Sequence, residues 1–238
     1  MAVDAVWAQA LAQCGVSAGS SVVIPELVEP GLVQPVADFG VRLVRADSLM
    51  QLGPARPAAM IIHSGGSPRG RILGHDHLRK VVMWAHERSV PLISDERELP
   101  YSWVLDAPSI LSDAVCDGNQ DGLIVIGSEA TGADHNSDGT SLDRHRARLQ
   151  RRRALLIPEL HAAGFHVEDS TGGKHLWCTK GELDTDTIAW LAAHDIPAEL
   201  GSTFGPRGAR HIRLSLDEPT EFIEAIAGQL RQAREAHE

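Results

Sequence analysis

Short apolar runs that alternate with amphipathic segments constrain the fold of this chain more than any other feature. Several of them, such as 58–63 and 122–127, are continuously apolar rather than alternating. Strands of that kind are buried on both faces, as in a parallel sheet covered by helices. The expected strands are 21–25, 41–44, 58–63, 91–95 and 122–127, and the expected helices are 3–14, 31–39 and 75–87. The pattern predicts an α/β fold with a mostly parallel sheet flanked by helices.

A second, smaller unit follows a break in this rhythm. Residues 128–141 contain no large apolar side chain and are typical of a linker or loop. After them we expect helices at 142–163, 184–193 and 218–236, and strands at 165–168, 175–179 and 210–216. We therefore expect a large domain over 1–133, a linker over 134–141 and a smaller α+β domain over 142–238.

Composition excludes several classes of function. The 238 residues carry a net charge of −10, a field that repels nucleic acid. No apolar run approaches the roughly 20 residues that a membrane helix needs. The first residues lack the basic charge of a secretory signal, and the three cysteines are far apart in sequence. We expect a cytoplasmic protein without disulfides that binds neither nucleic acid nor membrane.

Polar motifs follow two of the predicted strands. H-S-G-G-S-P-R-G begins at His63, and S-D-E contains Asp95. Open parallel sheets bind ligands at the carboxyl ends of their strands. These two segments are therefore the first candidates for a site, with His63, Ser67 and Asp95 as the side chains of interest.

The order of these motifs resembles fold-type I, pyridoxal-phosphate-dependent class I/II aminotransferases. A strand, a Ser-Pro-x-Gly turn, a helix of the form L-x-x-V-x-x-W-A and a strand ending in S-D-E match the large domain of that family. The resemblance is closest to the succinyldiaminopimelate aminotransferase branch. The segments that carry it are P-A-R-P-A-A-M-I-I-H-S, G-H-D-H-L-R-K-V-V-M-W-A, L-W-C-T-K-G-E and G-A-R-H-I-R-L-S-L.

The resemblance implies two retained site residues. Asp95 matches the acid that pairs with the cofactor's pyridinium nitrogen. Arg213 matches the small-domain arginine that binds the substrate carboxylate through its two-pronged guanidinium. Ser67 stands in place of the family's asparagine, and Arg97 or Glu98 in place of its tyrosine.

The same resemblance implies several losses. Thr131 stands where the family has its Schiff-base lysine, and a hydroxyl cannot replace that amine. The N-terminal arm, the phosphate cradle and the phosphate-binding arginine that follows the lysine also have no counterpart. The chain has three lysines, Lys80, Lys174 and Lys180. Of these, only Lys174 falls in a stretch that the family turns toward the substrate.

Three further motifs carry little weight. Two histidines in G-H-D-H, with His63, suggest a metal, but a third ligand at a fixed spacing is missing. Ser128, Asp134 and His135 share one loop without the strand-to-helix elbow that a catalytic triad needs. The arginines of 144–153 lie on a helix among Leu142, Leu149, Leu155 and Leu156, a pattern of a solvated helix face or a surface for an acidic partner.

We therefore expect a protein that no longer performs pyridoxal-phosphate transamination and holds no cofactor and no metal. The first hypothesis is a cofactor-independent enzyme acting on a small amino-acid-derived carboxylate in a biosynthetic pathway. The candidate residues are Asp95, His63, Lys174 and His175 for catalysis, and Arg213, Ser67 and Gly173 for substrate binding.

Two alternatives stand beside this hypothesis. One is a non-catalytic partner subunit of a biosynthetic enzyme or a full-length aminotransferase, assembled as a homodimer or a heteromer. The other is residual use of pyridoxal phosphate through Lys174. A purified protein that forms a covalent adduct with the cofactor would favour the latter.

Overall fold

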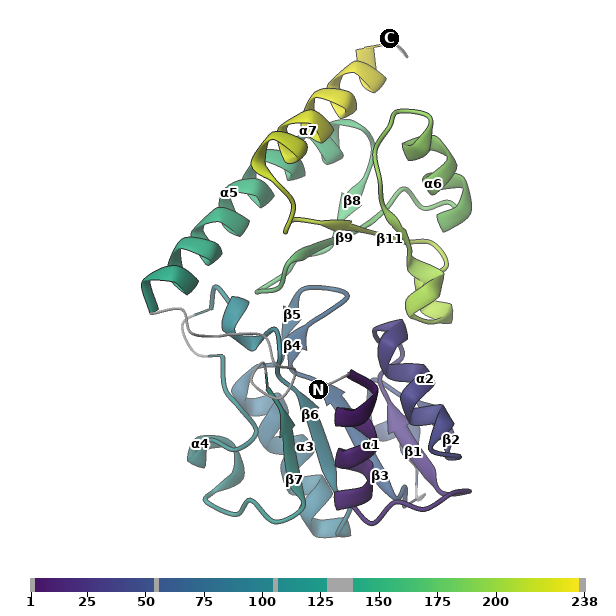
Figure 1. Ribbon diagram of the computed structural model, residues 1–238, viewed down its shortest axis with the longest axis vertical. Coiled ribbons are helices and arrows are strands. Elements are labelled where there is room, and N and C mark those ends of the chain that lie inside the picture. Colours follow the sequence, from purple (N-terminus) through teal and green to yellow (C-terminus); the bar gives the residue numbers. More distant parts are fainter. Residues whose placement is uncertain (1–2, 54–55, 105–106, 128–138, 236–238) are drawn as a thin grey trace.

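A five-stranded sheet forms the core of the first half of the chain (Figure 1). The computed structural model describes residues 3–53, 56–104, 107–127 and 139–235. The strands of the sheet are β1 (Ser21–Ile24), β2 (Arg42–Arg45), β3 (Ala59–His63), β6 (Leu92–Asp95) and β7 (Leu123–Ile126). Their order is β2-β1-β3-β6-β7, and every neighbouring pair is parallel. The predicted mostly parallel sheet is confirmed.

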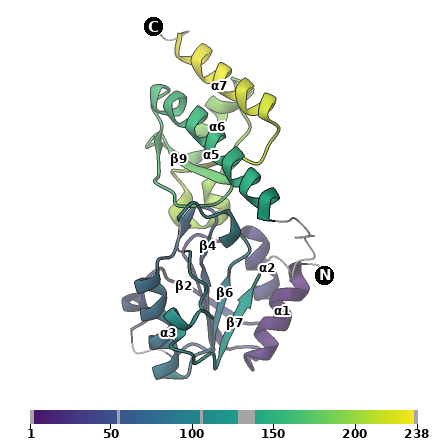
Figure 2. The ribbon, with the colours of Figure 1, turned by 90° about the vertical axis from the view of Figure 1, so that its left-hand side faces the viewer.

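Helices cover both faces of this sheet, as Figure 2 shows. They are α1 (Val3–Gln13), α2 (Pro30–Asp38), α3 (His75–Arg88) and α4 (Asp113–Cys116). The α1 and α2 side chains pack with alternate strand residues such as Ile61, and those of α3 and α4 with the others, such as Ile62. Leu78 of α3 is fully buried, which stabilises the fold by about 1.5–3 kcal/mol.

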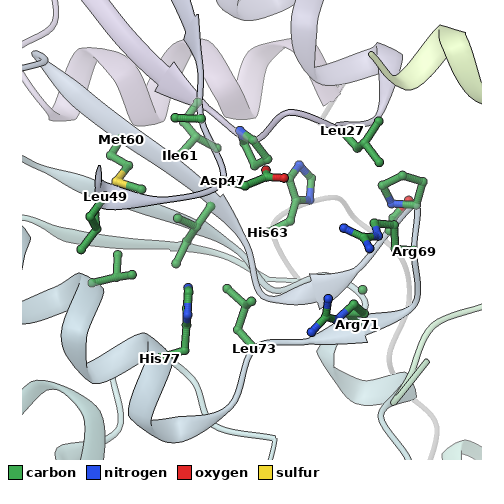
Figure 3. A pocket seen from close by; sticks show the side chains of 17 residues that line it. Leu27, Asp47, Leu49, Met60, Ile61, His63, Arg69, Arg71, Leu73 and His77 are labelled. Atoms are coloured by element: carbon green, nitrogen blue, oxygen red, sulfur yellow. The ribbon is translucent and has the colours of Figure 1, made fainter. Parts of the chain in front are cut away.

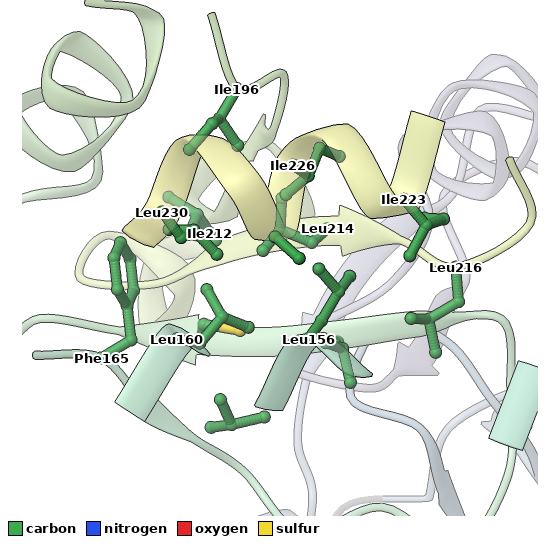
Figure 4. Close-up of a cluster of buried hydrophobic side chains, with 14 of the residues drawn as sticks. Leu156, Leu160, Phe165, Ile196, Ile212, Leu214, Leu216, Ile223, Ile226 and Leu230 are labelled. Carbon is green, nitrogen blue, oxygen red and sulfur yellow. The ribbon is translucent and has the colours of Figure 1, made fainter. Parts of the chain in front are cut away.

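The second half has an antiparallel sheet with helices packed on it. Its elements are α5 (Gly139–Ala162), β8 (His166–Val167), β9 (His175–Thr179), α6 (Asp184–Ala192), β10 (Glu199–Leu200), β11 (Ile212–Ser215) and α7 (Thr220–Glu235). The strand order is β10-β11-β9-β8. Figure 4 shows Leu156 and Leu160 of α5 meeting Ile226 and Leu230 of α7 over the strands. This is the smaller α+β unit that the sequence predicts.

The sequence pattern misses several short elements. They are the hairpin strands β4 (Gly65–Gly66) and β5 (Arg71–Ile72), the short helix α4, and 3-10 turns at Leu49–Leu52, Leu99–Tyr101, Gly201–Phe204 and Pro206–Gly208. Helix α5 begins at Gly139, inside the segment expected to be a linker. The expected boundary after residue 133 lies outside the described residues. No helix within the described ranges is long and apolar enough to cross a membrane.

The two halves meet along a seam of backbone contacts. The Val28 amide donates to the Phe204 carbonyl over 2.9 Å, and the Thr171 amide donates to the Gly70 carbonyl over 2.7 Å. Leu27 of the first half packs against Trp177 and Phe204 of the second. The seam runs along the carboxyl ends of the parallel strands, so any ligand bound there touches both halves.

Gly205 tests how closely the halves approach. Its φ is +149°, and a Cβ at this position would overlap the carbonyl oxygen of Glu26 in the other half. We expect Gly205→Ala to cost about 2 kcal/mol and to lower the Tm by roughly 4–8 °C. Gly228→Ala on helix α7 is the control, because a Cβ there would meet only the flexible end of the Arg231 side chain, at 4.0 Å. Alanine should stabilise that helix by up to about 1 kcal/mol. Equal Tm values for the two variants in a thermal melt would show that the seam is looser than described.

Candidate active site

Asp95 and His63 lie side by side where two neighbouring strands end. They are register partners at the carboxyl ends of β6 and β3, and His63 Nδ1 is 3.3 Å from Asp95 Oδ2. Asp95 is only 4% exposed. Arg97 grips the same carboxylate, with Nε 2.8 Å from Oδ1 and Nη2 2.6 Å from Oδ2. The structure therefore brings together the two candidates from the strand ends, and it places Arg97 beside them.

Charge and burial set the ionisation of this pair. Burial by itself would raise the pKa of Asp95, but the hydrogen bonds and the positive charge of Arg97 act against burial, and the pKa of Asp95 lies below its ordinary value. Burial lowers the pKa of His63, and the negative charge of Asp95 opposes that shift. Asp95 is thus an anion at neutral pH beside a neutral imidazole. His63 Nε2 is shielded from solvent and has no hydrogen-bond partner among the described residues.

Glu98, one turn beyond Asp95, is a second acid of this site. Its Oε2 atom is shielded from solvent and has no hydrogen-bond partner within the described ranges. Burial raises the pKa of Glu98 to about 7, and the charge of Lys174 works in the opposite direction. A carboxyl group with this pKa can hold or release a proton near neutral pH.

Arg213 reaches this site from the second half of the chain. It lies on β11, is 7% exposed, and its Nη1 donates to Ser67 Oγ over 3.1 Å. The same Nη1 contacts Glu29 at the start of α2, and Nε donates to Glu199 over 2.5 Å. Ser67 Oγ also donates to the Glu29 carboxylate. Two internal carboxylates therefore occupy the guanidinium in this structure.

A cavity of about 330 Å³ adjoins Arg213 on the second half. His175, Glu199 and Phe222 are among its lining residues. Burial, together with the charge of Arg213, lowers the pKa of His175 to about 3, so this imidazole is neutral at physiological pH. The lining also holds the carboxylates of Glu199 and Glu218, and Glu199 already pairs with Arg213, so this cavity carries no free positive charge among the described residues.

Lys174 and Gly173 lie on the seam beside the strand ends. Lys174 Nζ is 3.5 Å from Asp217 Oδ2 and 4.3 Å from the centre of the Tyr101 ring. The Gly173 amide donates to the Tyr101 carbonyl over 3.2 Å, and a Cβ on Gly173 would come within 3.5 Å of Glu98 Oε2. Lys174 is therefore on the side of the site where Glu98 lies.

The partners of Arg213 and Asp95 escape sequence analysis. Glu29 and Glu199 stand in segments without a motif, and only tertiary structure places them against Arg213. Arg97 follows Asp95 by two residues, and its backbone amide donates to Asp95 Oδ1. An arginine two residues after a strand-end aspartate is a sequence signal for this pairing. The resemblance placed Arg97 only as a substitute for tyrosine.

Two other expectations meet different outcomes. Arg152, expected on a solvated face of the basic helix, is 7% exposed and donates to the Leu216 carbonyl over 2.9 Å. The expectation of a solvated arginine face is wrong there, because α5 turns this side chain toward the end of β11. Ser128, Thr131, Asp134 and His135 lie outside the described residues. Within the described ranges, no group of three or more histidine, cysteine or acidic residues has the geometry of a metal site.

Comparison with known proteins identifies similar chains. The chain is 35% identical, over 91% of its length, to a probable aminotransferase of Mycobacterium tuberculosis, Rv1178, and spans 61% of that relative. It is 28% identical over 92% of its length to the 4-dedimethylamino-4-oxo-anhydrotetracycline transaminase OxyQ of Streptomyces rimosus, and spans 72% of it. No protein-family model matches the chain.

Solved structures agree on the fold. The α-aminoadipate aminotransferase LysN of Thermus thermophilus, complexed with N-(5'-phosphopyridoxyl)-L-leucine, superposes with a TM-score of 0.80 at 18% identity. The match covers 98% of this chain and 75% of that one. The chain has the aminotransferase fold, with the parallel sheet flanked by helices that its sequence predicts.

These comparisons correct the expected function. A cofactor-independent enzyme, or a non-catalytic subunit, was inferred from the missing lysine at position 131. Both curated relatives match nearly the whole chain, and one is named as an aminotransferase and the other as a transaminase. These matches overturn that inference. The expectation of pyridoxal-phosphate independence is wrong for the same reason. That inference rested on the threonine at position 131 together with the other expected losses at the cofactor site.

The raised pKa of Glu98 predicts how stability changes with pH. In the folded protein the pKa of Glu98 is about 7, whereas its ordinary value is 4.5, so the folded state binds the proton more tightly than the unfolded state. Stability from this group is therefore complete below about pH 4.5 and is lost as pH rises to about 7. Glu98→Gln should remove this loss and stabilise the protein at pH 8 by up to about 3 kcal/mol relative to wild type, with no gain at pH 4.

Denaturant unfolding of both proteins at pH 4, 6 and 8 measures the effect. Glu235→Gln is the control, since that carboxyl is exposed near the end of α7. The same pH dependence in wild type and Glu98→Gln would mean that the Glu98 carboxyl is solvated.

Proposed function

We propose that this chain is a pyridoxal-phosphate-dependent aminotransferase whose site lies on the seam between the two halves. The observation that carries the proposal is the 3.1 Å contact of Arg213 with Ser67, which brings a carboxylate-binding arginine to the strand ends that hold Asp95. The names of the two curated relatives support it. So does LysN, which holds a phosphopyridoxyl amino acid in the same fold.

The polar groups of the site fit the ring end of this cofactor. When bound, pyridoxal phosphate supplies an aldehyde that takes up an amino group and a ring that withdraws electrons. Asp95 is a buried anion suited to accept a hydrogen bond from the ring nitrogen. The unpartnered His63 Nε2 and Glu98 Oε2 atoms leave polar capacity for a ligand. Both carboxylate oxygens of Asp95 accept hydrogen bonds from Arg97, so one of these bonds would have to break when the ring nitrogen binds.

Lys174 is the amine that we assign to covalent attachment of the cofactor. Lys80 is exposed on α3, and Lys180 lies 4.0 Å from the centre of the Trp190 ring, away from the strand ends. Lys174 is 26% exposed on the seam, and its charge acts on Glu98. Glu98 can then hold or release a proton on the same side of the site.

Arg213 would bind the substrate carboxylate in place of an internal one. Its guanidinium contacts Glu29 and Glu199 from different elements, so an incoming carboxylate must displace one of them. Glu29 is the candidate, because it also faces Ser67 at the strand ends. Exchange of one carboxylate for another keeps the buried guanidinium paired throughout.

Narrower features of this proposal rest on the sequence. The motif resemblance favours a substrate like that of the succinyldiaminopimelate branch. Arg213 favours any amino acid and 2-oxo acid pair whose carboxylate it can bind. We also propose a cytoplasmic protein that assembles as a homodimer or with another biosynthetic protein, as the sequence analysis expects.

Cofactor titration tests the proposal directly. Addition of pyridoxal phosphate to the purified chain should produce a visible absorption band, and borohydride should fix a pyridoxyl adduct on Lys174 that peptide mass spectrometry locates. Lys174→Ala should lose the adduct, whereas Lys180→Ala, the matched control, should keep it. Asp95→Asn should weaken cofactor binding at least about tenfold through loss of the charged partner.

Two results would contradict the proposal. A chain that shows no band and no saturable binding does not use this cofactor. An adduct confined to Lys80 or Lys180 would remove Lys174 from the site.

Arg213→Gln is expected to separate substrate binding from cofactor binding. Loss of the two-pronged cation should raise the KM for a 2-oxo acid at least about tenfold and leave the dissociation constant of the cofactor unchanged. Arg213→Lys keeps the charge and should give an intermediate KM. Arg210→Gln is the control, because Arg210 is exposed near the same strand. An unchanged KM in Arg213→Gln would place the substrate carboxylate elsewhere.

A further inference from the structure

A second cavity, of about 280 Å³, lies on the α3 side of the parallel sheet (Figure 3). Met60 and Ile62 of β3 and Val81 of α3 belong to its lining and to the core on that face. The Asp95 carboxylate is held instead by Arg97, whose guanidinium lies 5.9 Å from the ring of Trp7 in the α1 core. The cavity borders His63 and Ser67 of the candidate active site but is centred on the other face.

The inner wall of this cavity is apolar. Met60, Ile62 and Val81 are buried, and Leu49 and Leu73 complete the same surface. Figure 3 shows Leu49 and Met60 on one side of the space and Leu73 on the other. Its volume is close to the lower limit of small-molecule pockets, about 300 Å³. Such a wall favours a compact hydrocarbon group.

The opposite, exposed side of the cavity carries positive charge. Arg69 and Arg71 extend toward it from the β4–β5 hairpin in Figure 3. Arg69 is already paired with Glu168 of the second half, Nε to Oε2 over 2.8 Å. Arg71 is exposed and makes no ion pair or side-chain hydrogen bond with any residue that the structure describes. Its five N–H donors are therefore available to a ligand.

Asp47, the acidic residue that lines this cavity, interacts with groups other than Arg71. Asp47 Oδ1 accepts the Glu26 amide over 2.9 Å, and Oδ2 is 3.8 Å from Arg207. Asp47 therefore does not neutralise Arg71, which stays without an ionic partner among the residues that the structure describes. A planar guanidinium matches a carboxylate in shape and charge.

We propose that this cavity binds a small monocarboxylate with an apolar body, at a site that borders the seam but does not include Arg213. The carboxylate pairs with Arg71, and the apolar body packs on Met60, Ile62 and Val81. The hairpin that carries Arg71 also holds Ser67 and meets the second half at Gly70, so a bound ligand would contact an element of the active site.

Methyl NMR of methionine with 3-phenylpropionate as the probe tests this site. Met60 is buried in the wall, whereas Met50 and Met83 are exposed, so the Met60 methyl signal alone should shift on saturable binding. Met60→Leu assigns that signal. The neutral analogue 3-phenylpropionamide should bind at least about tenfold more weakly, because it lacks the charge that Arg71 recognises.

Variants identify the cation that is responsible. Arg71→Gln should weaken binding of 3-phenylpropionate at least about tenfold, and Arg42→Gln, an exposed arginine on β2, should not. Unchanged Met50 and Met83 signals confirm that each variant is folded. Arg213→Gln should leave the Met60 shift intact, which separates this site from the seam.

Three outcomes overturn the inference. The Met60 signal does not move with the probe, the amide binds as tightly as the acid, or Arg213→Gln rather than Arg71→Gln abolishes the shift. None of these results depends on pyridoxal phosphate, so the proposed aminotransferase function stands or falls by its own titration.

Discussion

The pairing of Arg213 with carboxylates is the charged contact that joins the two halves at the candidate site. Glu29 comes from the first half and Glu199 from the second, so one buried guanidinium joins both. A buried cation of this kind needs compensating charge, and removing its partners would cost several kcal/mol. The seam is therefore held by charge as well as by apolar contact. A carboxylate ligand that binds Arg213 must displace Glu29 or Glu199. Its binding free energy is therefore the difference between its own interaction with Arg213 and the one that it replaces.

The sequence predicts the fold because burial on both faces leaves a strong pattern. The continuous apolar runs of β3 and β6 and the three-and-four spacing of α3 locate these elements to within a residue or two. The hairpin of β4 and β5 has two residues in each strand, two of them glycine, and so has no periodicity to detect. Helix α5 begins among small polar residues, which favour loops as much as helix starts.

The candidate site could be predicted in part. The rule that ligands bind at the carboxyl ends of parallel strands found His63 and Asp95, and the family resemblance found Arg213. The acids around Arg213 are remote in sequence and belong to no motif, so tertiary structure alone places them. The functional inference failed differently, because the threonine at 131 and the other expected losses at the cofactor site outweighed the resemblance of the whole chain.

The packing around Trp177 has a spectroscopic consequence. This indole is 1% exposed, stacks on the His211 ring with a centroid distance of 5.3 Å, and meets Phe204 edge-on at the seam. Indole emission depends on the polarity and motion of its surroundings. Trp84 and Trp190 pack within their own halves, against Arg88 and Phe165. Any hinge motion that separates Phe204 from Leu27 would therefore alter the light emitted by Trp177 far more than that of Trp84 or Trp190, and the molecule carries an intrinsic optical reporter of its own opening.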